Sequence, residues 1–90
     1  MIRQRIRFTG RVQAVGFRYR AKQAAAISKV TGFVRNEYDG SVIMEVQGTL
    51  DQIGQTIAFL YASPYIRIDG IERENVAVKP GESDFRVHHI

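Results

Sequence analysis

The stretch from residue 10 to residue 18 contains residue types that could bind an anion. It reads Gly-Arg-Val-Gln-Ala-Val-Gly-Phe-Arg and lies where a strand-like pattern changes to a helical one. At such a junction successive backbone N–H groups can converge, and the positive end of the helix dipole adds to their attraction for an anion. Gly10 and Gly16 bracket the stretch and allow conformations or close ligand approach that a Cβ hinders. We name the middle of this stretch the cradle; its residues are Arg11, Val12, Gln13, Ala14, Val15 and Gly16.

Arg18 falls in the first turn of the predicted helix, close enough to place a planar guanidinium on the same anion through two hydrogen bonds. A cation in a first turn opposes the helix dipole, so its presence there without a neighbouring acid indicates a negatively charged ligand. The stretch lacks the Gly-Lys-Ser/Thr ending of a nucleotide P-loop and the G-x-G-x-x-G pattern of a dinucleotide site. From spacing alone, an ordinary turn followed by a solvated arginine remains the alternative.

The distribution of charge also favours an anionic ligand. Residues 1–36 contain nine Lys and Arg and no Asp or Glu, whereas residues 37–90 contain four Lys and Arg and all nine acids. A basic region of this length is expected to attract a small phosphorylated molecule or a nucleic-acid backbone. A solvated basic surface without a ligand explains the composition equally well.

The elements that must position these residues follow from hydrophobic periodicity. Alternation over residues 2–12 predicts a strand, and residues 17–29 predict a helix that buries Phe17, Ala21, Ala24 and either Ile27 or Ser28. Further along, we predict a hairpin of strands at 33–36 and 42–46, followed by a helix over 50–60 that Thr49 caps. A strand then begins at Ile66, breaks at Asp69-Gly70 and resumes to Val78. A last strand is predicted at 85–87. This β-α-β-β-α-β order predicts an α+β, ferredoxin-like sandwich, with an antiparallel sheet that carries both helices on one face and room for an extra terminal strand.

Length and composition predict one domain over residues 1–90. The absence of cysteine excludes a disulfide framework, a thiolate zinc site and a thiol nucleophile. No apolar run approaches the length of a membrane span, and the first residues lack a signal-peptide pattern. We therefore expect a cytoplasmic protein that has no membrane partner.

Two motifs resemble those of the acylphosphatase family. Residues 10–18 are similar to the family's G-x-V-Q-G-V-x-F-R, and residues 32–36, Gly-Phe-Val-Arg-Asn, are similar to its G-W-V-x-N. An Asp-Gly-Ser-Val turn at residues 39–42 follows, as in the family. The order, separation and chain length also agree, so the resemblance covers essentially all 90 residues.

This resemblance implies hydrolysis of an acyl phosphate, R-CO-OPO3, to a carboxylate and inorganic phosphate. Arg18 matches the family's phosphate-binding arginine, Asn36 its water-orienting asparagine, and the backbone of residues 11–16 its phosphate-binding loop. The resemblance implies no metal, no cofactor and no covalent intermediate. It also implies no general base, because the substrate phosphate itself takes the proton from the water. We expect a monomer that binds a small acyl phosphate and that inorganic phosphate, its product, inhibits.

The chain departs from the family's motifs at three positions. Ala14 replaces the usual loop glycine, and if this position requires a positive φ, an L-residue there costs about 1 kcal/mol or more. Phe33 replaces the usual tryptophan and keeps an aromatic ring. Glu37 stands where a small hydroxyl residue is frequent, and its carboxylate would repel substrate unless it points away from the site. These departures bear on the rate rather than on the type of reaction.

Two other functions fit the same topology. RNA-binding modules share this element order, but their aromatic-rich strand is the third, and residues 42–47 contain no aromatic residue. We therefore do not expect a nucleic-acid partner. A non-catalytic regulatory domain of the acylphosphatase fold is the second alternative.

Two further groups of polar residues are not expected to form a site. We interpret His88-His89 as a solvated pair at the end of a strand, and the acids Asp69, Glu72 and Glu74 as a solvated strand edge.

Overall fold

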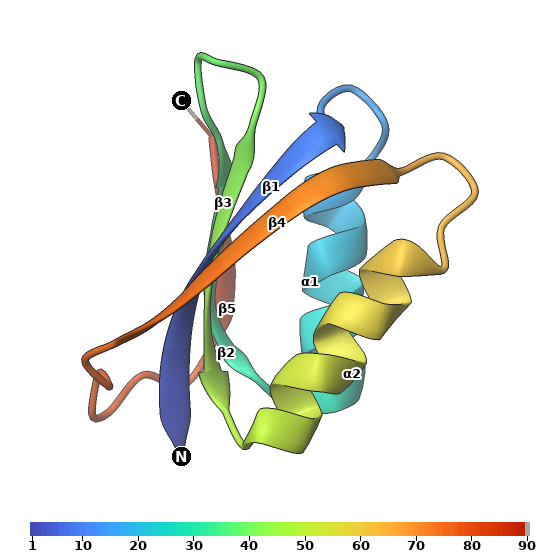
Figure 1. Ribbon diagram of the computed structural model, residues 1–90. Helices are drawn as coiled ribbons and strands as arrows, with labels where there is room; N and C mark the ends of the chain where they lie inside the picture. The colour runs from blue at the N-terminus through green and yellow to red at the C-terminus, as the bar shows by residue number, and fades with distance from the viewer. Residues whose placement is uncertain (90) are drawn as a thin grey trace.

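The computed structural model describes residues 1–89, which form two helices and five strands (Figure 1). In chain order they are β1 (Ile2–Arg11), α1 (Phe17–Ser28), β2 (Thr31–Asn36), β3 (Val42–Gly48), α2 (Leu50–Tyr61), β4 (Arg67–Val76) and β5 (Phe85–His88).

The five strands form one sheet in the order β4-β1-β3-β2-β5, and both helices cover the same face of it (Figure 1). The neighbouring pairs are antiparallel for β4 with β1, β1 with β3, and β3 with β2. The pair of β2 with β5 is parallel. The chain crosses from one edge of the sheet to the other between Val76 and Phe85, so β5 enters beside β2 in the same direction. The predicted ferredoxin-like fold is therefore confirmed, and the extra terminal strand makes the sheet mixed.

Helix α1 buries its apolar positions against the sheet. Phe17, Ala21, Ala24 and Ser28 are buried, whereas Ile27 is 67% exposed, so Ser28 is the correct choice between the two predicted positions. The helix ends at Lys29, which adopts a left-handed φ of 60° and donates its backbone N–H to the carbonyl of Ala25. A left-handed residue at this place closes a helix by satisfying its last carbonyl groups.

Helix α2 begins at the predicted cap. The Thr49 hydroxyl accepts from the backbone N–H of Gln52, and the Gln52 side chain accepts from the backbone N–H of Thr49, so a complete capping box is present. Ile53, Ile57 and Leu60 then form the buried face.

Strand β4 differs from the prediction because Asp69-Gly70 does not interrupt it. Thr9 of β1 lies opposite Gly70, but Gly10 lies opposite Ile68, so Asp69 is an extra residue that forms a β-bulge. Gly10 has a φ of +121°, and a Cβ there would lie 2.4 Å from the carbonyl oxygen of Arg67. The close approach that requires a glycine at position 10 is thus an approach to β4.

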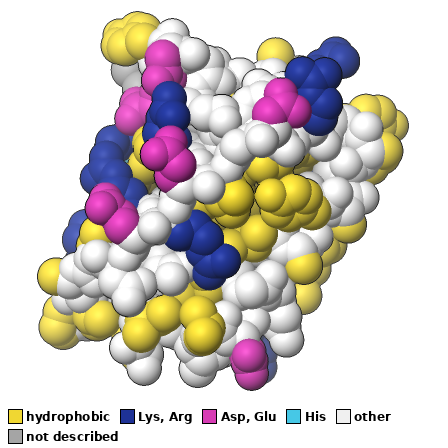
Figure 2. Space-filling model, in the orientation of Figure 1, with side chains coloured by type: hydrophobic (Ala, Val, Ile, Leu, Met, Phe, Trp, Pro, Cys, Tyr) yellow, Lys and Arg dark blue, Asp and Glu magenta, His cyan; other side chains and the backbone are white. Residues whose placement is uncertain are grey.

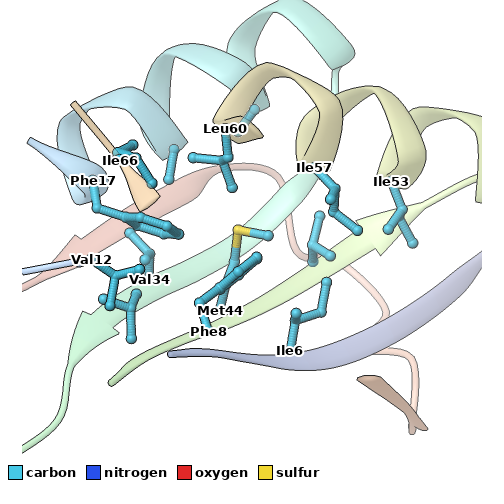
Figure 3. Packing of buried hydrophobic residues seen from close by; sticks show 14 of the residues in the cluster. Ile6, Phe8, Val12, Phe17, Val34, Met44, Ile53, Ile57, Leu60 and Ile66 are labelled. Carbon is cyan, nitrogen blue, oxygen red and sulfur yellow. The ribbon is translucent and has the colours of Figure 1, made fainter. Parts of the chain in front are cut away.

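The hydrophobic core lies between the sheet and the helices and fixes both ends of the cradle (Figure 3). Val12 is fully buried and Phe17 is 2% exposed. The Phe17 ring packs against Phe8 of β1, with ring centroids 5.0 Å apart. The cradle is therefore a short loop between two residues that are anchored in the core.

The other face of the sheet carries a network of ion pairs. Figure 2 shows basic and acidic side chains side by side on the side of the molecule where the sheet lies. Arg3, whose side chain is fully buried, pairs with Glu45 at 2.7 Å and with Glu82 at 2.8 Å. Arg7 pairs with Asp39 and Glu72. Several cations of the acid-free first 36 residues are thus neutralised by acids distant in sequence and do not form one continuous basic surface.

Candidate active site

The cradle has the backbone geometry of an anion-binding loop. Ala14 has a φ of 58° and Gly16 a φ of 77°, and both are left-handed. Left-handed residues that alternate with ordinary ones turn successive N–H groups toward a common side and form a concave nest for an anion. Position 14 therefore does require a positive φ, so Ala14 is strained by about 1–2 kcal/mol relative to a right-handed conformation.

Arg18 lies in the first turn of α1 and is half-buried. Its Nη1 donates to the backbone carbonyl oxygen of His88 over 3.0 Å and lies 3.4 Å from Nδ1 of His89. Within residues 1–89 it forms no ion pair with an acid. The end of β5 thus holds the guanidinium while its charge remains available to a ligand.

Asn36 is the last residue of β2 and lies on the same face of the sheet as the buried Val34, two residues earlier. Asn36 and Arg18 line one pocket of about 400 Å³ at the N-terminal end of α1. Three predicted cradle residues complete its inner wall: Val12, Ala14 and Gly16. Among residues 1–89, no Asp or Glu side chain lines this pocket.

The remaining predicted cradle residues do not line this pocket. Arg11 and Val15 line a second groove on the other side of the cradle, which shares Ala14 with the pocket. The Gln13 side chain instead turns toward the β2–β3 hairpin, where its Nε2 donates to the carbonyl oxygens of Glu37 at 2.7 Å and Ser41 at 2.9 Å. Gln13 therefore ties the cradle to the residue that follows Asn36, a role that its position in the motif did not indicate.

The carboxylate of Glu37 points away from the pocket. It pairs with Arg35 at 3.3 Å, and Glu37 lines a depression on the ion-paired face of the sheet. Next in the hairpin, the hydroxyl and backbone N–H of Ser41 and then the Arg7 guanidinium hold the pKa of Asp39 far below its usual range. The acids nearest to Asn36 are thus engaged elsewhere and do not face an anion in the pocket.

Four residues of the pocket wall were not identified from the sequence: Tyr19, Lys22, Val87 and His89. Lys22 follows Arg18 by four residues on the same helix face, and this spacing could have indicated it. Val87 and His89 reach the site through the parallel pairing of β5 with β2, for which the sequence has no local signal. His88 and His89 are both exposed, as predicted, and His89 in addition lies in the pocket wall.

Comparison with known proteins identifies the family. The family model Acylphosphatase matches residues 4–87. An acylphosphatase of Caldanaerobacter subterraneus is 36% identical over 84 residues, which cover 92% of this chain and 93% of the relative. This chain belongs to the acylphosphatase family. The predicted family and the predicted enzyme class are both confirmed.

Solved structures agree with this assignment. The crystal structure of acylphosphatase from Bacillus subtilis has a TM-score of 0.90 and 29% identity, and the match covers 99% of this chain and all of that one. The crystal structure of T. kodakarensis HypF contains a similar region, with a TM-score of 0.85 and 30% identity, but the match covers only 12% of that chain. The acylphosphatase fold therefore occurs both alone and within a much longer chain.

Residues 1–89 contain neither a membrane-spanning helix nor a cluster of metal ligands. No helix in this part of the chain combines the length and apolar character that crossing a membrane requires. No group of three or more His, Asp or Glu residues in the same range lies close enough together to hold a metal ion.

Proposed function

We propose that this acylphosphatase hydrolyses small acyl phosphates to a carboxylate and inorganic phosphate in the pocket between the cradle and Asn36. The observation that carries the proposal is that Arg18 and Asn36, which come from α1 and β2, line one pocket beside a left-handed loop, and that no other lining residue within 1–89 is an Asp or Glu. An anion-binding loop, a guanidinium and a neutral amide are the groups that phosphoryl transfer to water needs.

The cradle N–H groups and Arg18 bind the phosphate oxygens. Because the guanidinium can form two parallel hydrogen bonds, it both orients the phosphate and offsets its charge. The hydrogen bond to His88 leaves the other guanidinium nitrogens available to the ligand. These groups hold the phosphorus in place and stabilise the charge that its oxygens carry in the transition state.

Asn36 positions the attacking water. Its side-chain carbonyl accepts a hydrogen bond from the water and its amide donates one, so the oxygen lone pair is directed at phosphorus. A bond forms between the water oxygen and phosphorus, while the bond between phosphorus and the acyl oxygen breaks and its electron pair leaves with the carboxylate. One proton of the water passes to a phosphate oxygen. A carboxylate is a good leaving group, so the proposal requires neither a strong general acid nor a metal.

We also propose that the chain works as a monomer in the cytoplasm. The groups that the proposed chemistry uses, namely the cradle N–H groups, Arg18 and Asn36, all lie within a single copy of the fold. The cysteine-free sequence fits a reducing compartment.

The ion-paired face of the sheet argues against nucleic-acid binding. Phe33 stacks on His88 there, with ring centroids 4.8 Å apart, and could resemble a base-stacking platform. However, Glu45 and Glu72 on the same face pair with arginines, and these paired cations are not free to bind a phosphate backbone. This arrangement supports a small-molecule substrate instead.

Benzoyl phosphate hydrolysis tests the proposed function. We expect the protein to accelerate its breakdown in the presence of EDTA, and inorganic phosphate to inhibit competitively. A rate equal to the spontaneous one would refute the proposal, and loss of activity in EDTA that added metal restores would refute its metal-free form. Salt-sensitive RNA binding without hydrolysis would favour the nucleic-acid alternative.

A further inference from the structure

The cradle is bordered by a second groove on the side opposite Asn36. This groove has a volume of about 440 Å³ and is lined by Arg11, Ala14, Val15, Pro64 and Tyr65. Pro64 and Tyr65 belong to the loop between α2 and β4, which reaches the same end of the molecule as the loop after β1 (Figure 1). Ala14 lines both the groove and the catalytic pocket, so the two adjoin at the cradle.

The geometry of phosphoryl transfer indicates which part of the substrate faces this groove. The attacking and leaving oxygens lie roughly in line through phosphorus, on opposite sides of it. Asn36, which holds the water, ends β2, and the cradle follows β1. In the sheet order β4-β1-β3-β2-β5, β2 and β4 lie on opposite sides of β1. A water that attacks from the β2 side therefore expels its leaving group toward the β4 side, where the groove lies.

We propose that this groove, the acyl groove, binds the acyl group of the substrate and that Arg11 stabilises the departing carboxylate. The inference rests on the proposed function and assigns the substrate class: acyl phosphates whose acyl group is aromatic or bulky and apolar. Tyr65 is 74% exposed and presents its ring to the groove beside Pro64 and Val15. An aromatic face and two apolar side chains suit a benzoyl-type group.

The surroundings of Arg11 support its role toward an anion. Arg11 lies opposite Arg67 in the register of β1 and β4, and like charges in this arrangement are destabilising. Arg67 is neutralised by Asp69, at 3.1 and 3.3 Å, whereas Arg11 forms no ion pair within residues 1–89. A carboxylate that forms in the groove would supply the negative charge that Arg11 lacks.

The discrimination between benzoyl phosphate and acetyl phosphate tests the groove. In Tyr65→Ala we expect kcat/KM for benzoyl phosphate to fall about tenfold, because a ring contact is lost, while kcat/KM for acetyl phosphate changes less than about twofold. Tyr61→Ala is the matched control, since Tyr61 is 52% exposed and lines neither the groove nor the pocket. It should leave the benzoyl-to-acetyl ratio unchanged.

Two results would overturn the inference. One is an unchanged ratio in Tyr65→Ala. The other is a change in the ratio that is larger in Tyr19→Ala than in Tyr65→Ala, which would place the acyl group in the pocket wall with Lys22. If the wild-type protein hydrolyses neither compound, the proposed function itself fails, so the two failures are distinguishable.

The dependence of kcat/KM on the leaving group tests the role of Arg11, because a purely structural residue would not change it. Across substituted benzoyl phosphates, Arg11→Gln should make log kcat/KM depend more steeply on the pKa of the leaving carboxylic acid, because poorer leaving groups need more stabilisation. Arg11→Lys should restore part of the wild-type slope. Arg86→Gln, which changes an exposed arginine on β5, is the control. An equal loss for all leaving groups would show that Arg11 does not act on the departing carboxylate.

Discussion

Nη1 of Arg18 donates to the backbone carbonyl oxygen of His88 over 3.0 Å, so the last strand of the sheet positions the arginine at the start of the first helix. This contact joins residues that are 70 positions apart in the sequence. An arginine at a helix N-terminus has a long, mobile side chain, and the carbonyl restricts it without consuming its charge. The parallel strand β5 therefore serves the site as well as the fold.

Arg18→Lys tests the need for a planar, two-pronged donor. Lysine keeps the charge but cannot form the parallel hydrogen bonds, so kcat/KM for benzoyl phosphate should fall by about a hundredfold. In Arg18→Gln, kcat/KM for benzoyl phosphate should fall further. Both variants should lose much of their affinity for inorganic phosphate. Wild-type phosphate inhibition in Arg18→Gln would show that the phosphate binds elsewhere.

Asn36→Ala tests the water-positioning role. Because Asn36 contacts water rather than phosphate in this account, kcat should fall by about a hundredfold while KM and the inhibition constant of phosphate change little. Steady-state kinetics at constant pH separate the two parameters. A large rise in KM at unchanged kcat would instead make Asn36 a substrate-binding residue.

Gln13→Glu tests the tether between the cradle and the hairpin. The variant keeps the shape of the side chain but loses both donors and directs a carboxylate at the carbonyl oxygens of Glu37 and Ser41. We expect the free energy of unfolding to fall by about 1–3 kcal/mol and kcat to fall more than KM rises, because Asn36 loses its fixed position. Urea denaturation and kinetics measure both effects. Gln23→Glu on α1 is the control, because it makes the same change on an exposed helix surface.

Ala14→Gly tests the strain in the cradle. Glycine removes the cost of a φ of 58° but gains freedom in the unfolded chain, so the free energy of unfolding should rise by at most about 1 kcal/mol. Because glycine relieves the strain in the loop that binds phosphate, the variant should also have a higher affinity for inorganic phosphate. A loss of stability in Ala14→Gly would mean that the strain at this position is smaller than the effect of glycine on the unfolded chain, and would contradict the cost of about 1–2 kcal/mol assigned to Ala14.

Glu82→Gln tests the pH dependence of stability. Burial alone would raise the pKa of Glu82. Hydrogen bonds from Arg3 and Thr31, together with the charges of Arg3 and Lys79, outweigh burial and lower the pKa below the ordinary value of 4.5. A lowered pKa stabilises the folded state above pH 4.5, and this contribution disappears as the pH falls through the folded value.

In the glutamine variant, Tm should therefore be lower at neutral pH, and the difference from wild type should shrink as the pH falls below 4.5. Asp39 retains its own lowered pKa, so part of the acid sensitivity remains in the variant. A constant difference in Tm across this range would contradict the assigned role of the Arg3–Glu82 pair.

Local sequence signals predicted most of the fold and the centre of the site. Thr49 was identifiable as a cap because it contacts a residue only three positions away. The cradle and Arg18 form one continuous motif, and Asn36 follows from a second motif. The break predicted in β4 was wrong because the Asp69 bulge is accommodated by Gly10 of another strand, a relationship without a local signal.

What the sequence did not predict depends on distant contacts. The acid-free first 36 residues indicated a basic surface, yet the register of the sheet brings Arg3 to Glu45 and Arg7 to Glu72. In the same way, Tyr65 reaches the cradle only because α2 ends beside it.

Hydrolysis of benzoyl phosphate in water labelled with the heavy oxygen isotope tests most directly whether an Asn36-held water attacks phosphorus. The new bond forms between the water oxygen and phosphorus, so the label should appear in the inorganic phosphate released by the enzyme, and the benzoate should remain unlabelled. Label in the benzoate would show attack at the acyl carbon and would contradict the proposed roles of the cradle and Asn36.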